Sequence, residues 1–465
     1  MSAKTKTEKR RKARQQARGR ATKIPALPPW SAERFCLMAK PAGASCNLRC
    51  EYCFYLEKQA VFAEDSPGQG QSSQRMSDEL LETYVRKYIE SQPGRGEVAF
   101  MWQGGEPTLM GLEFFEKAVR LQDKYAAGRQ ITNSLQTNGT LLDDGWGRFL
   151  HERNFLLGLS LDGPAEIHNA YRRDASGAGS FDAVMRGLDV LKRHEVEFNI
   201  LASVTPAATA KPLDVYRFFR EAGVKFIQFL GIVERLPDDA EAKQGLHLAQ
   251  GLVGGDVVAS PKLTPWSVGP VDYGRFLCEI FDDWLGRDVG SIFVMNFEWA
   301  MAGSMGRPAM VCKFMPQCGS APVVEHNGEV YSCDHYVYPR NRLGNIATDD
   351  LREMMASPAQ RNFGQAKLTT LPKYCRNCPV LASCWGGCPK HRFMQTPDGQ
   401  PGLNYLCAGY RKFFLHAAPH FQAMAALLKA GRPAAEIMRG KSNQPSVISK
   451  NRKETEKTGF PLARE

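Results

Sequence analysis

The sequence predicts an α/β protein: a partial (β/α)6 barrel followed by a cysteine-rich domain. Strand and helix patterns alternate about six times between residues 34 and 234, which is typical of parallel α/β folds. Short polar motifs follow the predicted strands, at the C-terminal ends where such folds carry their chemistry. Eight of the thirteen cysteines lie between residues 312 and 407, so a metal-binding unit is expected after the barrel.

Each element follows from a local pattern. Residues 35–41 predict the first strand, and Ser77 is expected to cap a helix over residues 76–92. The following strands are predicted at residues 98–110, 131–139, 155–163, 197–205 and 225–234. Helices are predicted between them at residues 112–128, 141–154, 181–196 and 212–224. A further helix is expected at residues 272–287 and a strand at residues 291–300.

Composition divides the chain into four expected units. They are a basic tail (1–30), the barrel (31–270), the cysteine-rich domain (271–425) and a polar tail (426–465). Two polar stretches, 59–75 and 235–270, are expected to be loops, the second near the barrel mouth.

Charge is concentrated at one end of the chain. Residues 1–23 contain ten Lys or Arg and one Glu, whereas the whole chain has a formal net charge of +11. The body is therefore almost neutral, so nucleic acid is not an expected partner. No stretch reaches the roughly 18 apolar residues of a membrane span, and no apolar segment follows the basic tail. A cytoplasmic monomer is expected.

Cys46, Cys50 and Cys53 form a C-x3-C-x2-C motif just past the first predicted strand. Three thiolates bind three corners of a [4Fe-4S] cluster and leave one iron open to a ligand. The aromatic pair that follows, Phe54 and Tyr55, is typical of radical S-adenosylmethionine (SAM) enzymes. A zinc site is the alternative for this motif alone.

Polar groups at the next strand ends are candidate SAM contacts. Gly104 and Gly105 allow close approach of a ligand, and the Glu106 carboxylate can accept from an ammonium group. Further candidates for the ribose and carboxylate are Gln136, Asn138, Ser160, Asp162 and Arg172. Asn-Gly and Asp-Gly are also common turn formers, so each residue alone is a weak signal.

The later cysteines give a second, independent signal. They are Cys312, Cys318, Cys333, Cys375, Cys378, Cys384, Cys388 and Cys407. Eight thiolates suffice for two fully ligated [4Fe-4S] clusters or for two zinc sites of four thiolates each. Fully ligated clusters have no open iron for SAM, so they would carry electrons or stabilise the fold.

Taken together, the motifs resemble the anaerobic sulfatase-maturating enzymes, radical SAM proteins with a C-terminal SPASM domain. The resemblance rests on CNLRCEYCFYLEK, MWQGGEPTLMG, LQTNGTLL, LSLDGP, FIQFLGIVER and the cysteine-rich stretches, and it covers residues 34–420. It implies three [4Fe-4S] clusters and SAM. In the implied crossed ligation, one auxiliary cluster takes Cys312, Cys318, Cys333 and Cys388, and the other takes Cys375, Cys378, Cys384 and Cys407.

The resemblance also implies an activity. Family members oxidise one Cys or Ser of a C/S-x-P-x-R motif in a sulfatase to Cα-formylglycine, after a deoxyadenosyl radical removes a Cβ hydrogen. The matching base is Asp334, while Tyr55 and Gln103 match cavity positions and Leu230 matches a contact on the adenine side. The implied partners are an unfolded or nascent sulfatase and a low-potential electron donor of the flavodoxin or ferredoxin type.

Two alternatives stay open. A SPASM maturase of another protein or ribosomal peptide, forming thioether or carbon–carbon crosslinks, would use the same chemistry up to hydrogen abstraction. A zinc-structured protein that binds nucleic acid through its basic tail would instead be colourless and contain zinc.

Overall fold

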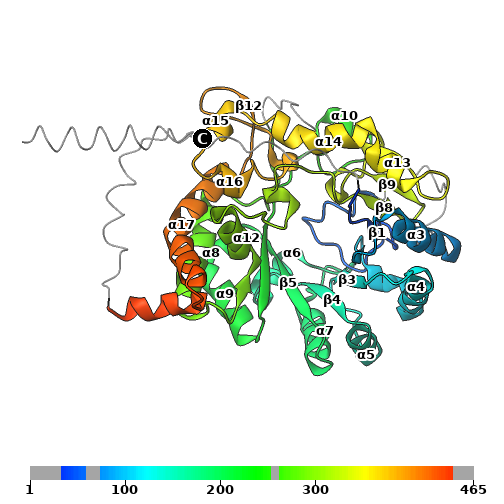
Figure 1. Cartoon of the computed structure of the whole chain (residues 1–465), viewed down its shortest axis with the longest axis horizontal. Coiled ribbons are helices and arrows are strands. Elements are labelled where there is room, and N and C mark those ends of the chain that lie inside the picture. Colours follow the sequence, from blue (N-terminus) through cyan, green and yellow to red (C-terminus); the bar gives the residue numbers. More distant parts are fainter. Residues whose placement is uncertain (1–32, 59–73, 253–260, 444–465) are drawn as a thin grey trace, which may run out of the picture.

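The predicted alternation builds a sheet whose first six strands are parallel and lie in chain order (Figure 1). The computed structural model describes residues 33–58, 74–252 and 261–443. The strands are β1 (Met38–Lys40), β2 (Val98–Trp102), β3 (Ile131–Thr137), β4 (Phe155–Ser160), β5 (Phe198–Val204) and β6 (Phe226–Gly231). Among the described strands the sheet does not close on itself, so the predicted partial α/β barrel is confirmed.

Helices connect these strands and cover the outer side of the curved sheet (Figure 1). The longer ones are α3 (Asp78–Ser91), α4 (Leu112–Tyr125), α5 (Asp144–Glu152), α7 (Phe181–Arg193), α9 (Pro212–Glu221) and α11 (Pro270–Arg287). Shorter ones are α6 (Ala165–Tyr171) and α8 (Pro206–Ala210), whereas α10 (Asp239–Lys243) belongs to the segment after β6 and lies away from this outer layer. As predicted, Ser77 caps α3 by accepting a hydrogen bond from the Leu80 amide.

Strands from the cysteine-rich half extend the same sheet at both ends. They are β7 (Phe293–Val294), β8 (Val323–Glu325), β9 (Glu329–Tyr331) and β10 (Arg342–Asn345). The strand β7 is parallel to β6, and β8 is parallel to β1 with Lys40 opposite Glu325. The two halves therefore share one sheet, and the domain boundary at residue 270 stays a prediction.

The strand predicted at residues 291–300 is wrong for most of its length. After the two residues of β7, the chain forms helix α12 (Met295–Ser304). The Asn296 side chain accepts from the Phe229 amide at 2.8 Å and donates to the Phe229 carbonyl oxygen at 2.9 Å. This side chain occupies the backbone groups of β6 that a longer partner strand would pair with, so the sheet stops there.

The rest of the cysteine-rich half consists of several short elements and one long helix, α17. They are α13 (Leu351–Ala356), α14 (Pro358–Thr369), α15 (Lys373–Arg376), α16 (Leu381–Cys384), β11 (Met394–Gln395), β12 (Pro401–Leu403) and α17 (Cys407–Lys429). The 3-10 turns are η3 (Pro107–Met110), η4 (Cys312–Phe314), η5 (Asp334–Tyr336), η6 (Pro339–Asn341), η7 (Pro389–His391) and η8 (Ala434–Asn443).

The ends of the chain differ in what can be compared with expectation. Helix α17 runs past residue 425, and Ala434 and Ile437 of η8 pack against the main core, so ordered structure enters the range expected to be a polar tail. The basic tail at residues 1–30 and the end at 444–465 lie outside the described residues, as does most of the loop at 59–75. None of the helices in the described ranges is long and apolar enough to cross a membrane.

Candidate active site and cluster-binding cysteines

The cluster loop (residues 43–53) follows β1 and carries the first three cysteines of interest. The Gly105 amide donates to the Gly43 carbonyl oxygen at 2.8 Å, and the Glu106 amide donates to that of Ser45 at 2.7 Å. A Cβ atom on Gly105 would lie 1.9 Å from the Ser45 carbonyl oxygen. Glycine is therefore required here, because the turn after β2 supports the cluster loop by direct backbone contact.

The thiols of this loop lie close together and are shielded from water. Burial, together with a smaller effect of the neighbouring Cys53, raises the pKa of Cys46 and Cys50 to about 12. For Cys50, the Arg172 guanidinium opposes this rise. Groups with such pKa values stay protonated unless a metal replaces the proton, because metal binding is coupled to thiol ionisation. Three clustered thiols beside a buried cation fit an anionic iron–sulfur cluster.

Glu106, a predicted SAM contact, is 1% exposed and already accepts hydrogen bonds from protein groups. Its donors are the Thr108 amide at 3.0 Å, the Thr137 hydroxyl at 2.7 Å and the Asn138 amide at 2.7 Å. Burial raises the pKa of Glu106, although these donors oppose the rise. The carboxylate thus joins the ends of β2 and β3 and fixes the turn that supports the cluster loop.

Three predicted amide side chains lie together at the ends of β2 and β3. Gln103 donates from Nε2 to Oε1 of Gln136. The Asn138 side chain donates to Oδ1 of Asn47, inside the cluster loop, at 2.8 Å. The side-chain nitrogen Nδ2 of Asn138 is also 3.9 Å from the Cys46 sulfur. The first sulfur of the loop is therefore within reach of a polar donor.

Asp162 and Arg172, two further predicted contacts, form a buried ion pair. Arg172 Nε donates to Oδ2 of Asp162 at 2.9 Å, and the Ser203 amide donates to Oδ1 at 2.8 Å. The Tyr52 hydroxyl also donates to this carboxylate. Because Tyr52 lies between Cys50 and Cys53, the pair holds the cluster loop against β4 and β5.

Two further predicted contacts lie near the ends of β4 and β6, the two strands on either side of β5. Ser160 is the last residue of β4 and is 7% exposed. Leu230 is half-buried near the end of β6, in register with Ser203 of β5. Both face the same end of the sheet as the cluster loop, as the strand pattern predicted.

Asp334, the predicted base, is paired with Lys40 at the end of β1. The Lys40 side chain is 3% exposed and the Asp334 side chain is 21% exposed. Burial alone would raise the pKa of Asp334, but the charges of Lys40, His335 and Lys390 outweigh it and hold this pKa below its ordinary value. Asp334 is therefore ionised at neutral pH, next to Cys333 in the chain.

A second buried pair lies beside the first. The Tyr55 hydroxyl donates to Oε1 of Glu325, whose side chain is fully buried. Lys40 Nζ lies 4.2 Å from the centroid of the Tyr55 ring. Burial raises the pKa of Tyr55 well above its ordinary value, and the Glu325 carboxylate adds to that rise. Tyr55 is thus a neutral hydroxyl that links the cluster loop to β8.

Four of the later cysteines lie near one another: Cys312, Cys318, Cys333 and Cys388. Burial raises the pKa of Cys333, and the nearby thiols of Cys312 and Cys388 raise it further. Cys318 has a pKa of about 12 because of burial, and Cys388 and Cys312 again add to the rise. The buried Lys367 donates to the Cys312 carbonyl oxygen at 2.6 Å. A buried ammonium beside four thiols fits an anionic cluster.

The other four cysteines line one small, mostly apolar cavity. They are Cys375, Cys378, Cys384 and Cys407. Arg411 reaches the same cavity, and its buried Nε has no hydrogen-bond partner in the described part of the chain. Such a donor needs an acceptor, and sulfide or thiolate of a bound cluster would supply one. The cysteines thus separate into the two crossed sets that the family resemblance implied.

Comparison with known families covers both halves. The model of the radical SAM superfamily matches residues 41–228, and that of the SPASM iron–sulfur cluster-binding domain matches residues 312–379. A serine-type anaerobic sulfatase-maturating enzyme of Bacteroides thetaiotaomicron is 46% identical over 87% of this chain and 94% of its own length. A cysteine-type enzyme of Clostridium perfringens is 35% identical over 87% of this chain and its own full length.

The chain belongs to the anaerobic sulfatase-maturating enzymes. Its activity is radical SAM oxidation of a sulfatase Ser or Cys to formylglycine. The solved structure of anSMEcpe with bound AdoMet matches with a TM-score of 0.71 and 34% identity, over 84% of this chain and 99% of that one. SAM and iron–sulfur clusters are the cofactors of this enzyme class, which rules out the zinc-structured alternative.

The sequence of this sulfatase-maturating enzyme did not lead us to the polar partners of Asp334 and Tyr55. Lys40 and Glu325 were not predicted, although each carries a signal. Lys40 is a charged residue inside the apolar strand 35–41, and Glu325 follows the apolar run APVV. Charged side chains in such positions are rarely buried without a polar partner, so each of them indicates a partner elsewhere in the chain.

Proposed function

We propose that the enzyme uses three [4Fe-4S] clusters and a single carboxylate base to convert a Cys or Ser in a C/S-x-P-x-R motif. The SAM-binding cluster takes Cys46, Cys50 and Cys53, and the auxiliary clusters take the two sets of four later cysteines. The substrate is an unfolded or nascent sulfatase. A low-potential flavodoxin or ferredoxin supplies electrons to a monomeric enzyme, whose cytoplasmic location stays a prediction.

The observation that carries this proposal is the ion pair that the partly buried Asp334 forms with Lys40. SAM with its cluster supplies a radical that removes a Cβ hydrogen, and the auxiliary clusters supply an electron acceptor. The Asp334 carboxylate accepts the hydroxyl or thiol proton of the target residue, and Lys40 keeps that carboxylate charged beforehand. Asp334 follows Cys333 directly, so a cluster held by Cys333 would lie close to the base and would supply a nearby electron acceptor.

Other residues prepare the site. Glu106 and the Asp162–Arg172 pair fix the cluster loop, and the residues proposed to touch SAM are Gly104, Gly105, Glu106, Gln136, Asn138, Ser160, Asp162, Arg172 and Leu230. Tyr55 and Gln103 line the cavity that receives the target residue. The 46% identity to the serine-type relative, against 35% to the cysteine-type one, supports a serine target.

A peptide assay tests the proposal. Peptides that differ in Ser or Cys at the first position of the motif are incubated anaerobically with reconstituted enzyme, SAM and a reductant. Formylglycine together with 5′-deoxyadenosine is the expected result. A crosslinked product instead of an aldehyde would favour a maturase of another peptide class.

A further inference from the structure

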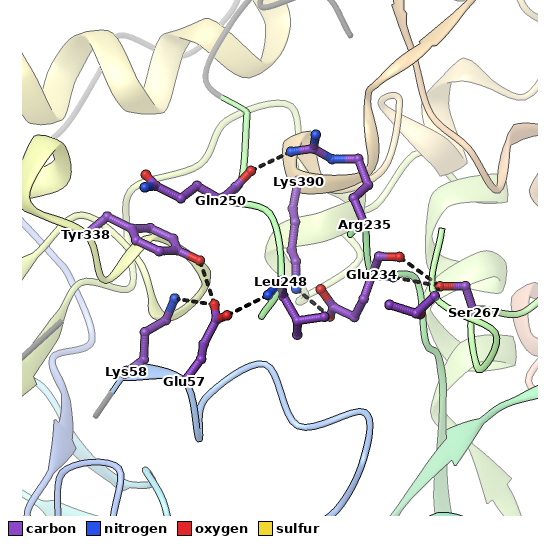
Figure 2. Close-up of polar contacts among 10 residues, drawn as sticks. Glu57, Lys58, Glu234, Arg235, Leu248, Gln250, Ser267, Tyr338 and Lys390 are labelled. Atoms are coloured by element: carbon purple, nitrogen blue, oxygen red, sulfur yellow. Dashed lines mark hydrogen bonds and ion pairs between the residues drawn. The ribbon is translucent and has the colours of Figure 1, made fainter. Parts of the chain in front are cut away.

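A buried polar network lies where three segments of the chain meet beside the cluster loop (Figure 2). Glu57 and Lys58 lie four and five residues after the end of the cluster loop, and Tyr338 follows Asp334 by four residues. The third segment, called here the strap (residues 246–252), belongs to the insertion after β6 and contributes Leu248. The network therefore connects the segment that follows the cluster loop with the loop that contains Asp334.

Glu57 is the centre of this network. Its Oε1 accepts from the Tyr338 hydroxyl at 3.0 Å and from Lys58 Nζ at 3.2 Å, and its Oε2 accepts from the Leu248 amide at 2.8 Å (Figure 2). Lys58 Nζ also lies 3.4 Å from the centroid of the Tyr338 ring. Glu57 is 8% exposed and Lys58 1%. Ionisable groups are seldom buried in this way unless the fold uses their bonds.

The strap is fixed to the base loop at further points. The Tyr336 hydroxyl donates to the Leu252 carbonyl oxygen at 2.8 Å, and Arg340 donates to that of Gly251. Glu57 adds the connection that runs to the cluster loop. The strap, the cluster loop and the loop that contains Asp334 and Tyr338 are therefore held together around the Glu57 carboxylate.

Contacts of Lys390 and Phe54 add a further connection between the cluster loop and the Asp334 loop. Lys390 donates to Glu234 at 2.6 Å (Figure 2). Its Nζ also lies 4.5 Å from the centroid of the Phe54 ring. The Phe54 ring in turn lies 4.8 Å from the ring of His335, which follows the base. Phe54 thus spaces the two loops by packing, whereas Glu57 spaces them by directed hydrogen bonds.

We propose that Glu57 is a positioning residue for the oxidation, which sets the separation between the cluster loop and the Asp334 loop. The proposal rests on the proposed function, because it assumes that Asp334 accepts the proton. The reaction needs the target Cβ hydrogen near the radical while the hydroxyl or thiol stays near Asp334. A misplacement of about 1 Å can reduce such a reaction by about a hundredfold. Radical formation itself does not need Asp334 and should persist when the loops separate.

Paired measurements on the reconstituted holoenzyme test this role. The first is the ratio of formylglycine to 5′-deoxyadenosine, and the second is hydrogen exchange at the Leu248 amide. The variants are Glu57→Ala, Glu57→Gln and Tyr338→Phe. Glu241→Ala is the matched control, because Glu241 accepts from the Gln250 amide of the same strap at 2.8 Å.

We expect Glu57→Ala to lower the product ratio about ten- to a hundredfold and to expose the Leu248 amide to exchange. Glu57→Gln should keep that amide protected, because one oxygen still accepts from it, and should recover part of the ratio. Tyr338→Phe should lower the ratio while Leu248 stays protected, and it keeps the test available if Glu57→Ala does not fold. Glu241→Ala should keep the wild-type ratio.

Two results would overturn the role of Glu57. One is a wild-type product ratio in Glu57→Ala, and the other is an equal fall in Glu57→Ala and Glu241→Ala, which would indicate general loosening of the strap. If the wild-type enzyme makes 5′-deoxyadenosine but no formylglycine, the proposed function fails instead. The exchange of Leu248 then still decides whether Glu57 holds the strap.

Discussion

Replacing Lys40 by methionine tests how the Asp334 carboxylate is kept ionised. Methionine preserves the length and apolar stem of the side chain and removes its charge. The pair is partly shielded from water, with side-chain exposures of 3% for Lys40 and 21% for Asp334. Removing one partner of a buried ion pair costs about 3–5 kcal/mol of folding free energy. The Lys40→Met holoenzyme should therefore unfold at a clearly lower denaturant concentration.

The same substitution changes the pH dependence in a defined direction. In the wild-type enzyme the pKa of Asp334 is below its ordinary value, so its stabilising charge is present above that ordinary value and is lost as the pH falls through the lowered one. Without Lys40, burial becomes the dominant influence and the pKa rises. The acid limb of formylglycine formation should move to higher pH, and activity lost at neutral pH should partly return on the alkaline side.

Formylglycine yield is measured by mass spectrometry across a pH series, with 5′-deoxyadenosine as the reference for radical formation. The neutral-pH loss is expected to reach about 10²-fold, the lower range for removal of a general base. Lys40→Arg, which keeps the charge, should leave the acid limb in place. An acid limb for Lys40→Met at the wild-type pH would refute the reasoning.

Three further substitutions test separate parts of the account. Tyr55→Phe leaves the buried Glu325 carboxylate without its hydroxyl donor and should cost about 1–3 kcal/mol in denaturant unfolding; an unchanged midpoint would count against the contact. Gly105→Ala places a Cβ 1.9 Å from a cluster-loop carbonyl oxygen and should abolish SAM cleavage, whereas wild-type cleavage would show that the loop can shift. Cys407→Ala should lower bound iron by about one four-iron cluster, while Cys278→Ala leaves iron content unchanged; equal iron in both would contradict the assigned cavity.

The sequence predicted the parallel strands and the location of the site well, because both depend on local patterns. Apolar runs of strand length end in Gly, Asn or Asp motifs, and consecutive parallel strands place those motifs at one edge. Spacing alone did not divide the eight later cysteines into two sets, and their crossed assignment came from the family resemblance. In the fold, Cys388 lies with Cys312 and Cys333 rather than with its sequence neighbour Cys384.

Long-range partners could not be predicted in the same way. Lys40 and Asp334 are separated by 294 positions, and they meet because β8 pairs with β1. Nothing in either local segment specifies that pairing. The misassigned segment at residues 291–300 has a related cause: a short apolar run fits a strand or a buried helix, and the Asn296 contact to β6 decides between them.

The central claim is that this enzyme forms formylglycine with Asp334 as the base. The most direct measurement is anaerobic mass spectrometry of a sulfatase peptide with the C/S-x-P-x-R motif, after incubation with wild-type enzyme or Asp334→Asn. The wild-type enzyme is expected to form both formylglycine and 5′-deoxyadenosine. With the variant, we expect continued SAM cleavage and a loss of formylglycine of about 10²–10⁴-fold. Wild-type yield of formylglycine from Asp334→Asn would contradict the claim.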